Sequence, residues 1–166
     1  MNATMRPPYI EFGVQSNFSF LRGASKPEEL VFTARLLGHA AMGLADRNTV
    51  AGVVRAWSQS KHIKLTKNSE PVTLPYHPGC RLVFGDGTPD ILAYPQDREG
   101  WGHLCRMLTQ ANLRPETEKG KTLLKRSDLM EWGDLLSLAV LPDVTAADDR
   151  TLTLLRGFRH RFGKDI

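Results

Sequence analysis

The chain has 166 residues, of which 41% are hydrophobic and 24% charged, and its formal net charge is +4. This is the composition of an ordinary globular domain large enough for a real core, and its mild basic excess permits an acidic partner without requiring one. The two cysteines, Cys80 and Cys105, form no CxxC pair, so a disulfide framework or zinc ribbon is unsupported, and no apolar run approaches the roughly 20 residues that span a bilayer.

The first part of the chain alternates strand-like and helix-like segments. A short β-compatible run over Tyr9–Gln15 predicts a first strand. Ser25 as N-cap, with Glu28 at the capping-box position, indicates the start of a helix that Gly38 would end. The apolar run Ala40–Ala45 has the length of a buried parallel strand.

A second helix is predicted for Thr49–His62 because apolar residues recur there at helical spacing. Its expected apolar face consists of Val50, Val53, Val54 and Trp57.

The second half of the chain begins with a predicted loop over 66–78 and continues with a hairpin. Strands at 80–84 and 90–94 flank the turn signal Gly85-Asp86-Gly87. The remaining predicted elements are a helix opened by Asp97, a short helix capped by Ser127 and ending at Trp132, a buried strand over Leu135–Leu141 and an amphipathic helix over Ala146–Phe162.

This order of elements predicts an α/β fold with a mainly parallel sheet, an inserted hairpin and helices on the outside. A closed (β/α) barrel needs about 250 residues, so four or five strand–helix units correspond to a partial barrel. We expect one domain over residues 1–166, with a flexible N-terminus at 1–8, and interpret it as a truncated piece of a larger barrel. A small open sheet, complete as it stands, is the alternative.

Parallel α/β folds carry their chemistry at the carboxyl ends of strands. Gly13 and Gln15 lie two apart on the first predicted strand and point the same way, as a metal-binding histidine pair would. Glycine, however, has no side chain, and a glutamine amide is a weak ligand.

The end of the second predicted strand carries Asp46, which could bind a cation, beside Arg47, which would repel one. We therefore expect Asp46 to accept backbone hydrogen bonds or to pair with an arginine. Asn48 or Thr49 is expected to cap the next helix.

Basic residues gather in several places and could contact phosphates. None of the five histidines belongs to an HxH or HExxH pattern, and we identify no catalytic residue. The candidates for nucleic-acid binding are Lys61, Lys64, Lys121, Lys125 and Arg126.

Four stretches of the sequence carry motifs whose combination is specific for one protein family, although no single motif would be. They are SNFSFLRGAS at 16–25 followed by PEEL at 27–30, GLADRNTVAGVVRA at 43–56, PGCRLVF at 78–84 with its continuation to 98, and 102–129. Together they resemble the N-terminal PHP (polymerase and histidinol phosphatase) domain of bacterial family-C DNA polymerase III alpha subunits. Within that family the sequence of these stretches looks most like that of the error-prone, translesion type.

The resemblance implies where a metal site would lie. Metal-binding PHP domains carry His-x-His on the first strand, which falls on Gly13 and Gln15, and Asp-His after the second, which falls on Asp46 and Arg47. An acidic ligand on the third strand falls on Arg81. Only Asp46 keeps a ligand type, so the resemblance implies a degenerate metal site, no bound metal and no catalysis by this chain.

The resemblance also implies a role. The chain would be a structural module of an error-prone DNA polymerase that carries out translesion synthesis in DNA repair and damage-induced mutagenesis, with palm, fingers and thumb outside this chain. The parent enzyme would use Mg²⁺, contact DNA and other translesion-synthesis subunits, and act in the cytoplasm away from membranes. The alternatives are a stand-alone metal-dependent phosphoesterase or exonuclease that uses Asp46, and a nucleic-acid-binding module.

Overall fold

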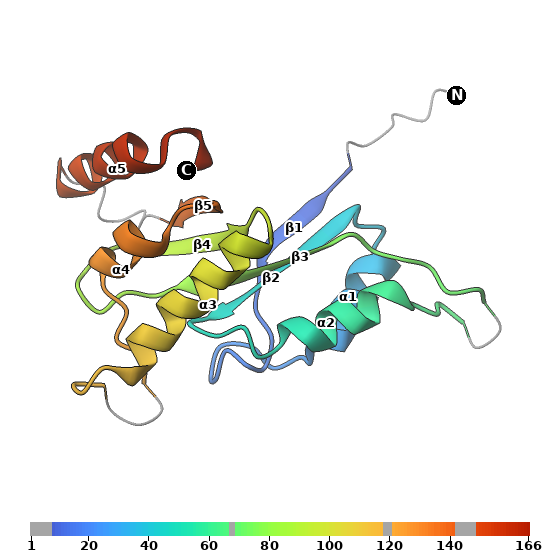
Figure 1. The fold of residues 1–166 in the computed structure, drawn as a ribbon. Coiled ribbons are helices and arrows are strands. Elements are labelled where there is room, and N and C mark those ends of the chain that lie inside the picture. Colours follow the sequence, from blue (N-terminus) through green and yellow to red (C-terminus); the bar gives the residue numbers. More distant parts are fainter. Residues whose placement is uncertain (1–7, 67–68, 118–120, 142–148) are drawn as a thin grey trace.

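The structure is a computed structural model that describes residues 8–66, 69–117, 121–141 and 149–166 (Figure 1). Within these ranges no helix is long and apolar enough to cross a membrane. In chain order the elements are β1 (Ile10–Val14), α1 (Pro27–Leu36), β2 (Ala41–Arg47), α2 (Val53–Lys61), β3 (Tyr76–Leu82), β4 (Asp90–Pro95), α3 (Arg98–Leu113), α4 (Arg126–Trp132), β5 (Leu136–Leu141), α5 (Asp149–Phe162) and the 3₁₀ turn η1 (Gly163–Asp165).

The strands form one curled sheet in the order β1-β2-β3-β4-β5. β1, β2 and β3 are parallel, whereas β4 is antiparallel to both β3 and β5, so β4 is the one reversed strand of the described sheet. The turn at 85–87 joins β3 to β4 as a hairpin, and Gly87 supplies the left-handed backbone that the turn needs, with φ of +82°. The expected α/β fold, with mainly parallel strands and an inserted hairpin, is confirmed.

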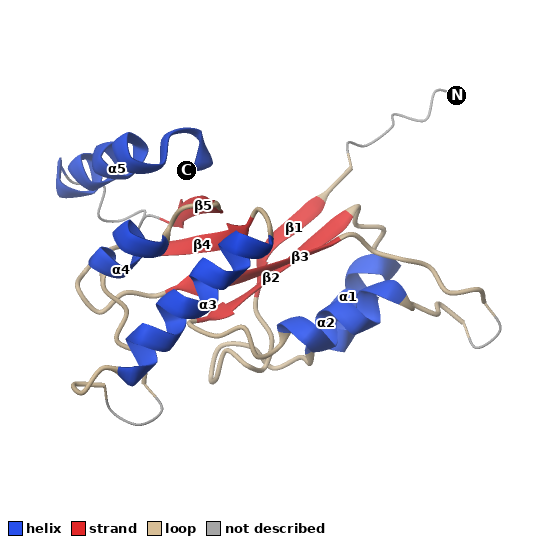
Figure 2. Cartoon of the chain, in the orientation of Figure 1, coloured by secondary structure: helices blue, strands red, loops and turns tan. Residues whose placement is uncertain are grey.

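The strand register explains why the helices lie on one face of the sheet. Met42 and Leu44 of β2 pack with α1 and α2, and Asp46, two residues further on, is the register partner of Cys80 on β3. Cys80 in turn pairs with Ala93 of β4, and both belong to the cluster that contains α3. Because side chains of one parity share a face, this side of the sheet is the helix face (Figure 2).

Two apolar clusters fix the helices to the helix face. Each fully buried aliphatic side chain in them contributes roughly 1.5–3 kcal/mol to stability. The smaller cluster joins α1, α2 and β2 through Val31, Ala34, Met42, Leu44, Ala56, Ile63 and Leu74. The larger one joins β3, β4 and β5 to α3, α4 and α5, with Leu104, Met107, Leu129, Phe158 and Phe162 among its members.

Tyr94 fills the opposite side of the sheet, which we call the open face. A Cβ atom at Gly79 would lie 2.5 Å from the Tyr94 ring, and one at Gly43 would lie 2.9 Å from its hydroxyl oxygen, so both positions need the small residue. Phe12 of β1 contacts the Tyr94 ring edge-on, with 5.3 Å between centroids. Burial of this phenol raises the pKa of Tyr94 to about 12.

Some predicted boundaries were wrong. β3 begins at Tyr76, so the end of the predicted 66–78 loop belongs to a strand. α1 begins after Lys26 instead of Ser25, because the Glu29 carboxylate accepts the Lys26 backbone N–H at 2.9 Å. Glu28, predicted to make that contact, pairs with Arg55 instead.

The same device sets the start of α4. Asp128 accepts the backbone N–H of Lys125 at 2.8 Å, so the helix begins after Lys125 and not at a Ser127 cap. The predicted start of the last helix, at 146–148, lies outside the described residues, and α5 is described from Asp149.

The predicted apolar face of α2 was right for Val53, which is buried, and for Val50, which packs against the larger cluster just before the helix, but it was wrong for the other two residues. Val54 and Trp57 are 71% and 54% exposed, and the residues that α2 buries are Val53, Ala56 and Ser60. Small side chains face α1 and the sheet here because the two helices pack closely at this position. The bulky pair therefore lies on the solvent side.

β5 differs from the prediction of a fully buried strand. Its residues alternate between buried Leu136 and Leu138 on the helix face and exposed Ser137 and Ala139 on the open face. β5 is an edge strand with one partner, β4, among the described strands, so only one of its faces is covered.

Candidate functional site at the carboxyl ends of the strands

Asp46 is the penultimate residue of β2 and is almost completely buried, with 1% of its surface exposed. Its Oδ1 accepts the Ser16 backbone N–H at 2.7 Å and the Ser19 hydroxyl at 2.6 Å, and its Oδ2 accepts the Ser16 hydroxyl at 2.7 Å. Both serines are buried as well. Three charge-assisted hydrogen bonds thus tie the loop after β1 to the end of β2.

Further contacts make this loop a closed network. The Ser19 hydroxyl oxygen accepts the Arg47 backbone N–H at 3.0 Å, and the Ser16 hydroxyl oxygen accepts the Phe18 N–H at 3.2 Å. The buried thiol of Cys80 donates to the Asp46 carbonyl oxygen at 3.3 Å, and burial raises the Cys80 pKa to about 12. Asp46 was predicted to accept backbone hydrogen bonds or to pair with an arginine. It accepts the Ser16 N–H, and among the described residues no arginine pairs with it.

The Asn48 side chain bonds to the backbone just after β3 instead of capping the next helix. Its side-chain amide donates to the Val83 carbonyl at 2.9 Å, and its side-chain oxygen accepts the Val83 N–H at 2.8 Å. Its backbone has φ of +50°, a conformation that asparagine tolerates better than most residues. The predicted Asn48 or Thr49 cap is wrong, because α2 begins only after Gly52.

Arg47 and Arg81 are register partners on neighbouring parallel strands and face the open side of the sheet. Arg81 Nε donates to Asp90 Oδ2 at 2.8 Å, while Arg47 Nη1 lies 3.6 Å from the same oxygen. Asp90 begins β4, which runs antiparallel, so its carboxylate reaches the carboxyl ends of β2 and β3. We call these three residues the Arg–Asp cluster.

Gly13 and Gln15 lie where β1 ends. Gly13 has φ of +81° at an irregularity in the β1–β2 pairing, and its N–H donates to the Tyr94 hydroxyl at 2.9 Å. A side chain here would be strained by that backbone and would meet Leu92 at 3.3 Å. Gln15 is half-buried just beyond the strand.

The structure brings some predicted site residues together and adds others. Asp46, Arg47 and Arg81 share one end of the sheet, but Asp46 points to the helix face and the two arginines to the open face. The sequence did not predict Ser16 and Ser19 as partners of Asp46, or Asp90 as the partner of the two arginines. The polar loop after the first strand was a signal for the serines, whereas Asp90 emerges only from strand register.

The basic residues proposed for nucleic-acid binding are all exposed but do not form one surface. Lys61 is the last residue of α2 and Lys64 follows soon after it, at the opposite end of the molecule from α4 in Figure 1. Arg126 begins α4, and Lys125 and Lys121 precede it.

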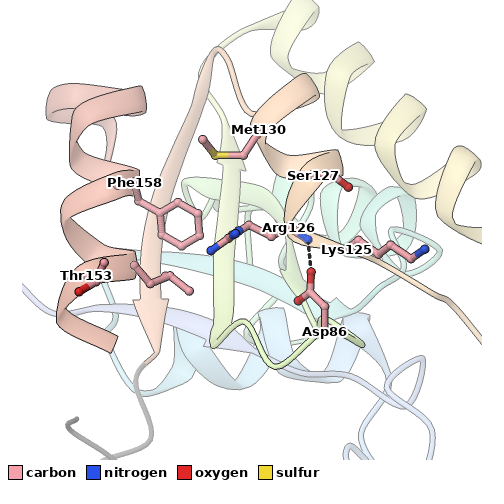
Figure 3. A pocket seen from close by; sticks show the side chains of 9 residues that line it. Asp86, Lys125, Arg126, Ser127, Met130, Thr153 and Phe158 are labelled. Carbon is pink, nitrogen blue, oxygen red and sulfur yellow. Dashed lines mark hydrogen bonds between the residues drawn. The ribbon is translucent and has the colours of Figure 1, made fainter. Parts of the chain in front are cut away.

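Lys125 and Arg126 border an open hollow of about 1030 Å³ between α4, α5 and the β3–β4 turn (Figure 3). The Arg126 side chain reaches toward Phe158, and its backbone N–H donates to Asp86 at 2.7 Å. Most of the lining surface is apolar, and none of the strand-end residues lines the hollow. The hollow is thus separate from the site at the strand ends.

Comparison with known proteins gives the family. The sequence pattern of the PHP domain matches residues 11–162, which is most of the chain. The chain therefore belongs to the PHP domain family. Its curled sheet with outer helices is a partial (β/α) barrel of the PHP type.

This PHP domain is similar to the "Error-prone DNA polymerase" of Mesorhizobium japonicum, with 70% identity over 166 residues, all of this chain and 14% of the relative. It is 47% identical over 149 residues to the "Error-prone DNA polymerase" of Sinorhizobium medicae, covering 90% of this chain and 12% of the relative. The chain thus spans about one-seventh of the length of the first of these curated relatives.

Two solved structures of lower identity align with parts of this chain. A structure described as a metal-dependent phosphoesterase from Bifidobacterium adolescentis aligns with a TM-score of 0.48 and 23% identity, over 76% of this chain and 51% of that chain. An amidohydrolase from Chromobacterium violaceum aligns with a TM-score of 0.45 and 20% identity, over 63% of this chain and 32% of that chain.

Proposed function

We propose that this chain is the N-terminal PHP module of an error-prone DNA polymerase and that it supports the polymerase domains without catalysing a reaction itself. The observation that carries the proposal is 70% identity along the whole chain to a protein of that name. Identity at this level extends over both clusters of the core and over the strand ends, so the relative would share this fold.

A metal-dependent activity of the chain would need a cation site, and the residues at the family's ligand positions do not suit one. Gly13 offers no ligand side chain, and Arg47 and Arg81 place positive charges at two of these positions, which would repel a divalent cation. Both Asp46 oxygens already accept hydrogen bonds from the serine loop. We therefore propose that the strand ends hold no metal ion.

The chemistry of the parent enzyme would lie in other domains. In this proposal DNA-directed synthesis past damaged bases depends on Mg²⁺ held by palm carboxylates outside this chain. DNA and other translesion-synthesis subunits would be partners of the whole enzyme, which would act in the cytoplasm. Exposed apolar side chains such as Phe20 and Leu21, more than 80% exposed, offer surface for contact with the rest of that enzyme.

A chimera tests this function. The matching region of the Mesorhizobium japonicum enzyme is replaced by this chain, and primer extension is measured on intact templates and on templates with an abasic site. We expect the chimera to extend primers on both, and a variant lacking the region to lose most of that activity. A folded chimera that extends neither template would contradict the proposal.

The isolated chain distinguishes the alternative of a nucleic-acid-binding module. Because Lys61 and Lys64 lie at the opposite end of the molecule from Lys125 and Arg126, we expect these candidate residues to form no continuous track for a DNA backbone. Tight, salt-dependent binding of primer–template DNA by the chain alone would favour that alternative.

A further inference from the structure

Arg47 and Arg81 form an unusual pair because two like charges lie opposite each other on neighbouring strands. Such an arrangement is destabilising unless an anion lies between the charges. The structure supplies one carboxylate, Asp90, and its Oδ2 is shared by both guanidinium groups. The cluster carries two positive charges and one negative charge, which leaves a net charge of +1 at the carboxyl ends of β2 and β3.

The hydrogen-bonding capacity of the pair is also largely unused. Each guanidinium has five N–H donors in a planar fork. Within the part of the chain that the structure describes, the hydrogen bond of the two guanidinium groups is the one from Arg81 Nε to Asp90. The 3.6 Å separation of Arg47 Nη1 and Asp90 is an ion pair but too long for a hydrogen bond.

The cluster is shielded but reachable. The side chains of Arg47 and Arg81 are each 31% exposed and that of Asp90 is 22% exposed. Partial burial weakens the screening of the cluster's positive charge by solvent. The exposed part of each arginine side chain, about a third of its surface, leaves N–H donors accessible to a ligand. Asp46 cannot neutralise the pair, because it points to the helix face, where Ser16 and Ser19 occupy its oxygens.

We propose that Arg47 and Arg81 form a binding site for a phosphate group on the open face of the sheet. A phosphate group has several oxygen atoms that can accept hydrogen bonds at once. Two planar guanidinium groups that donate to these oxygens are therefore an arrangement that favours phosphate. Asp90 holds the two side chains in place when the site is empty and competes with the ligand for them. This site concerns the chain's own residues and stands whether or not the chain belongs to a polymerase.

Inorganic phosphate is the probe that tests the site, at low ionic strength, with the arginine Nε–H resonances of the isotopically labelled chain as readout. We expect saturable shifts of the Arg47 and Arg81 resonances, and affinity about tenfold lower in Arg47→Gln and in Arg81→Gln, the scale of one lost charge-assisted hydrogen bond. Arg55→Gln is the matched control, because Arg55 pairs with Glu28 on the outer surface at 3.0 Å, and it should bind phosphate as the wild type does.

Asp90→Asn keeps the test decisive if an arginine variant does not fold. Removing the competing carboxylate should tighten phosphate binding, so phosphate should raise the melting temperature of Asp90→Asn more than that of the wild type. Absence of saturable shifts in the wild type, equal binding of acetate, or equal affinity in the wild type and Arg81→Gln would each overturn the proposal.

Oligonucleotides identify the source of the phosphate. Competition by a 5′-phosphorylated single strand, but not by its unphosphorylated twin, would assign the site to a terminal phosphate, and equal competition would assign it to the backbone. If neither competes while inorganic phosphate binds, the ligand is free phosphate. A failed polymerase chimera would leave these results unchanged, so the two proposals fail separately.

Discussion

At the scale of single residues, Asp46 joins the loop after β1 to the sheet. Because the carboxylate is buried with three donors around it, Asp46→Ala would leave the Ser16 N–H without its acceptor. We expect the variant to lose about 2–4 kcal/mol of unfolding free energy, measured by urea denaturation, and Ser19→Ala to lose about 1 kcal/mol. Arg55→Gln, which breaks an exposed ion pair, is the control and should change the unfolding free energy by less than about 1 kcal/mol. An Asp46→Ala chain as stable as the wild type would contradict this role.

Cys80 predicts a pH dependence. Its thiol keeps its proton in the folded chain up to a pKa of about 12, while an ordinary thiol ionises at 9.0. Above pH 9.0 the unfolded chain therefore binds fewer protons than the folded chain, and stability falls as the pH rises toward 12. Urea denaturation at neutral and alkaline pH should show a smaller alkaline loss in Cys80→Ala than in the wild type. Equal losses in the two proteins would contradict the prediction.

How far the site could be predicted depends on the distance of each contact along the chain. A buried carboxylate at a strand end predicts that its oxygens accept hydrogen bonds, and Asp46 does accept the Ser16 N–H. Which groups donate depends on loop closure between residues 30 positions apart. The pairing of Arg47 with Asp90 depends on the register of three strands, which no local pattern encodes.

At the scale of an element, two glycines of α3 form a matched pair. A Cβ at Gly100 would meet the Leu135 carbonyl oxygen closer than real Cβ atoms come, whereas one at Gly102 meets nothing within 4 Å. We expect Gly102→Ala to stabilise the chain by about 0.5–1 kcal/mol through helix propensity, and Gly100→Ala to destabilise it by about 1–3 kcal/mol. Thermal unfolding of both variants checks the pair. A stabilising Gly100→Ala would show that α3 does not contact Leu135, just before β5, at this position.

Strands were the elements most readily predicted, because apolar runs of strand length mark them directly. Helix faces were harder. In α2 the apolar residues Val54 and Trp57 recur at helical spacing, yet the buried side of the helix is the one that carries Val53 and Ala56. The spacing of apolar residues predicts that a helix has an apolar side. Packing against α1 decides which residues of α2 are buried.

At the scale of the whole molecule, the described sheet has two edges, β1 and β5, and several large apolar side chains are exposed. Open edges and exposed apolar patches favour association between copies. We expect light scattering to show an average mass that rises with protein concentration, and Trp57→Lys, at an exposed site on α2, to reduce that rise. A monodisperse monomer at every concentration would contradict the expectation.

The central claim is our proposal that the strand ends, where Arg47, Arg81 and Asp90 form the Arg–Asp cluster and Asp46 is held by the serine loop, bind no metal ion. Calorimetric titration of the chain with Zn²⁺ and with Mn²⁺, beside Asp46→Ala, tests it most directly. The account predicts no stoichiometric binding and the same heats for both proteins. Tight binding of one or more equivalents by the wild type, abolished in Asp46→Ala, would contradict it.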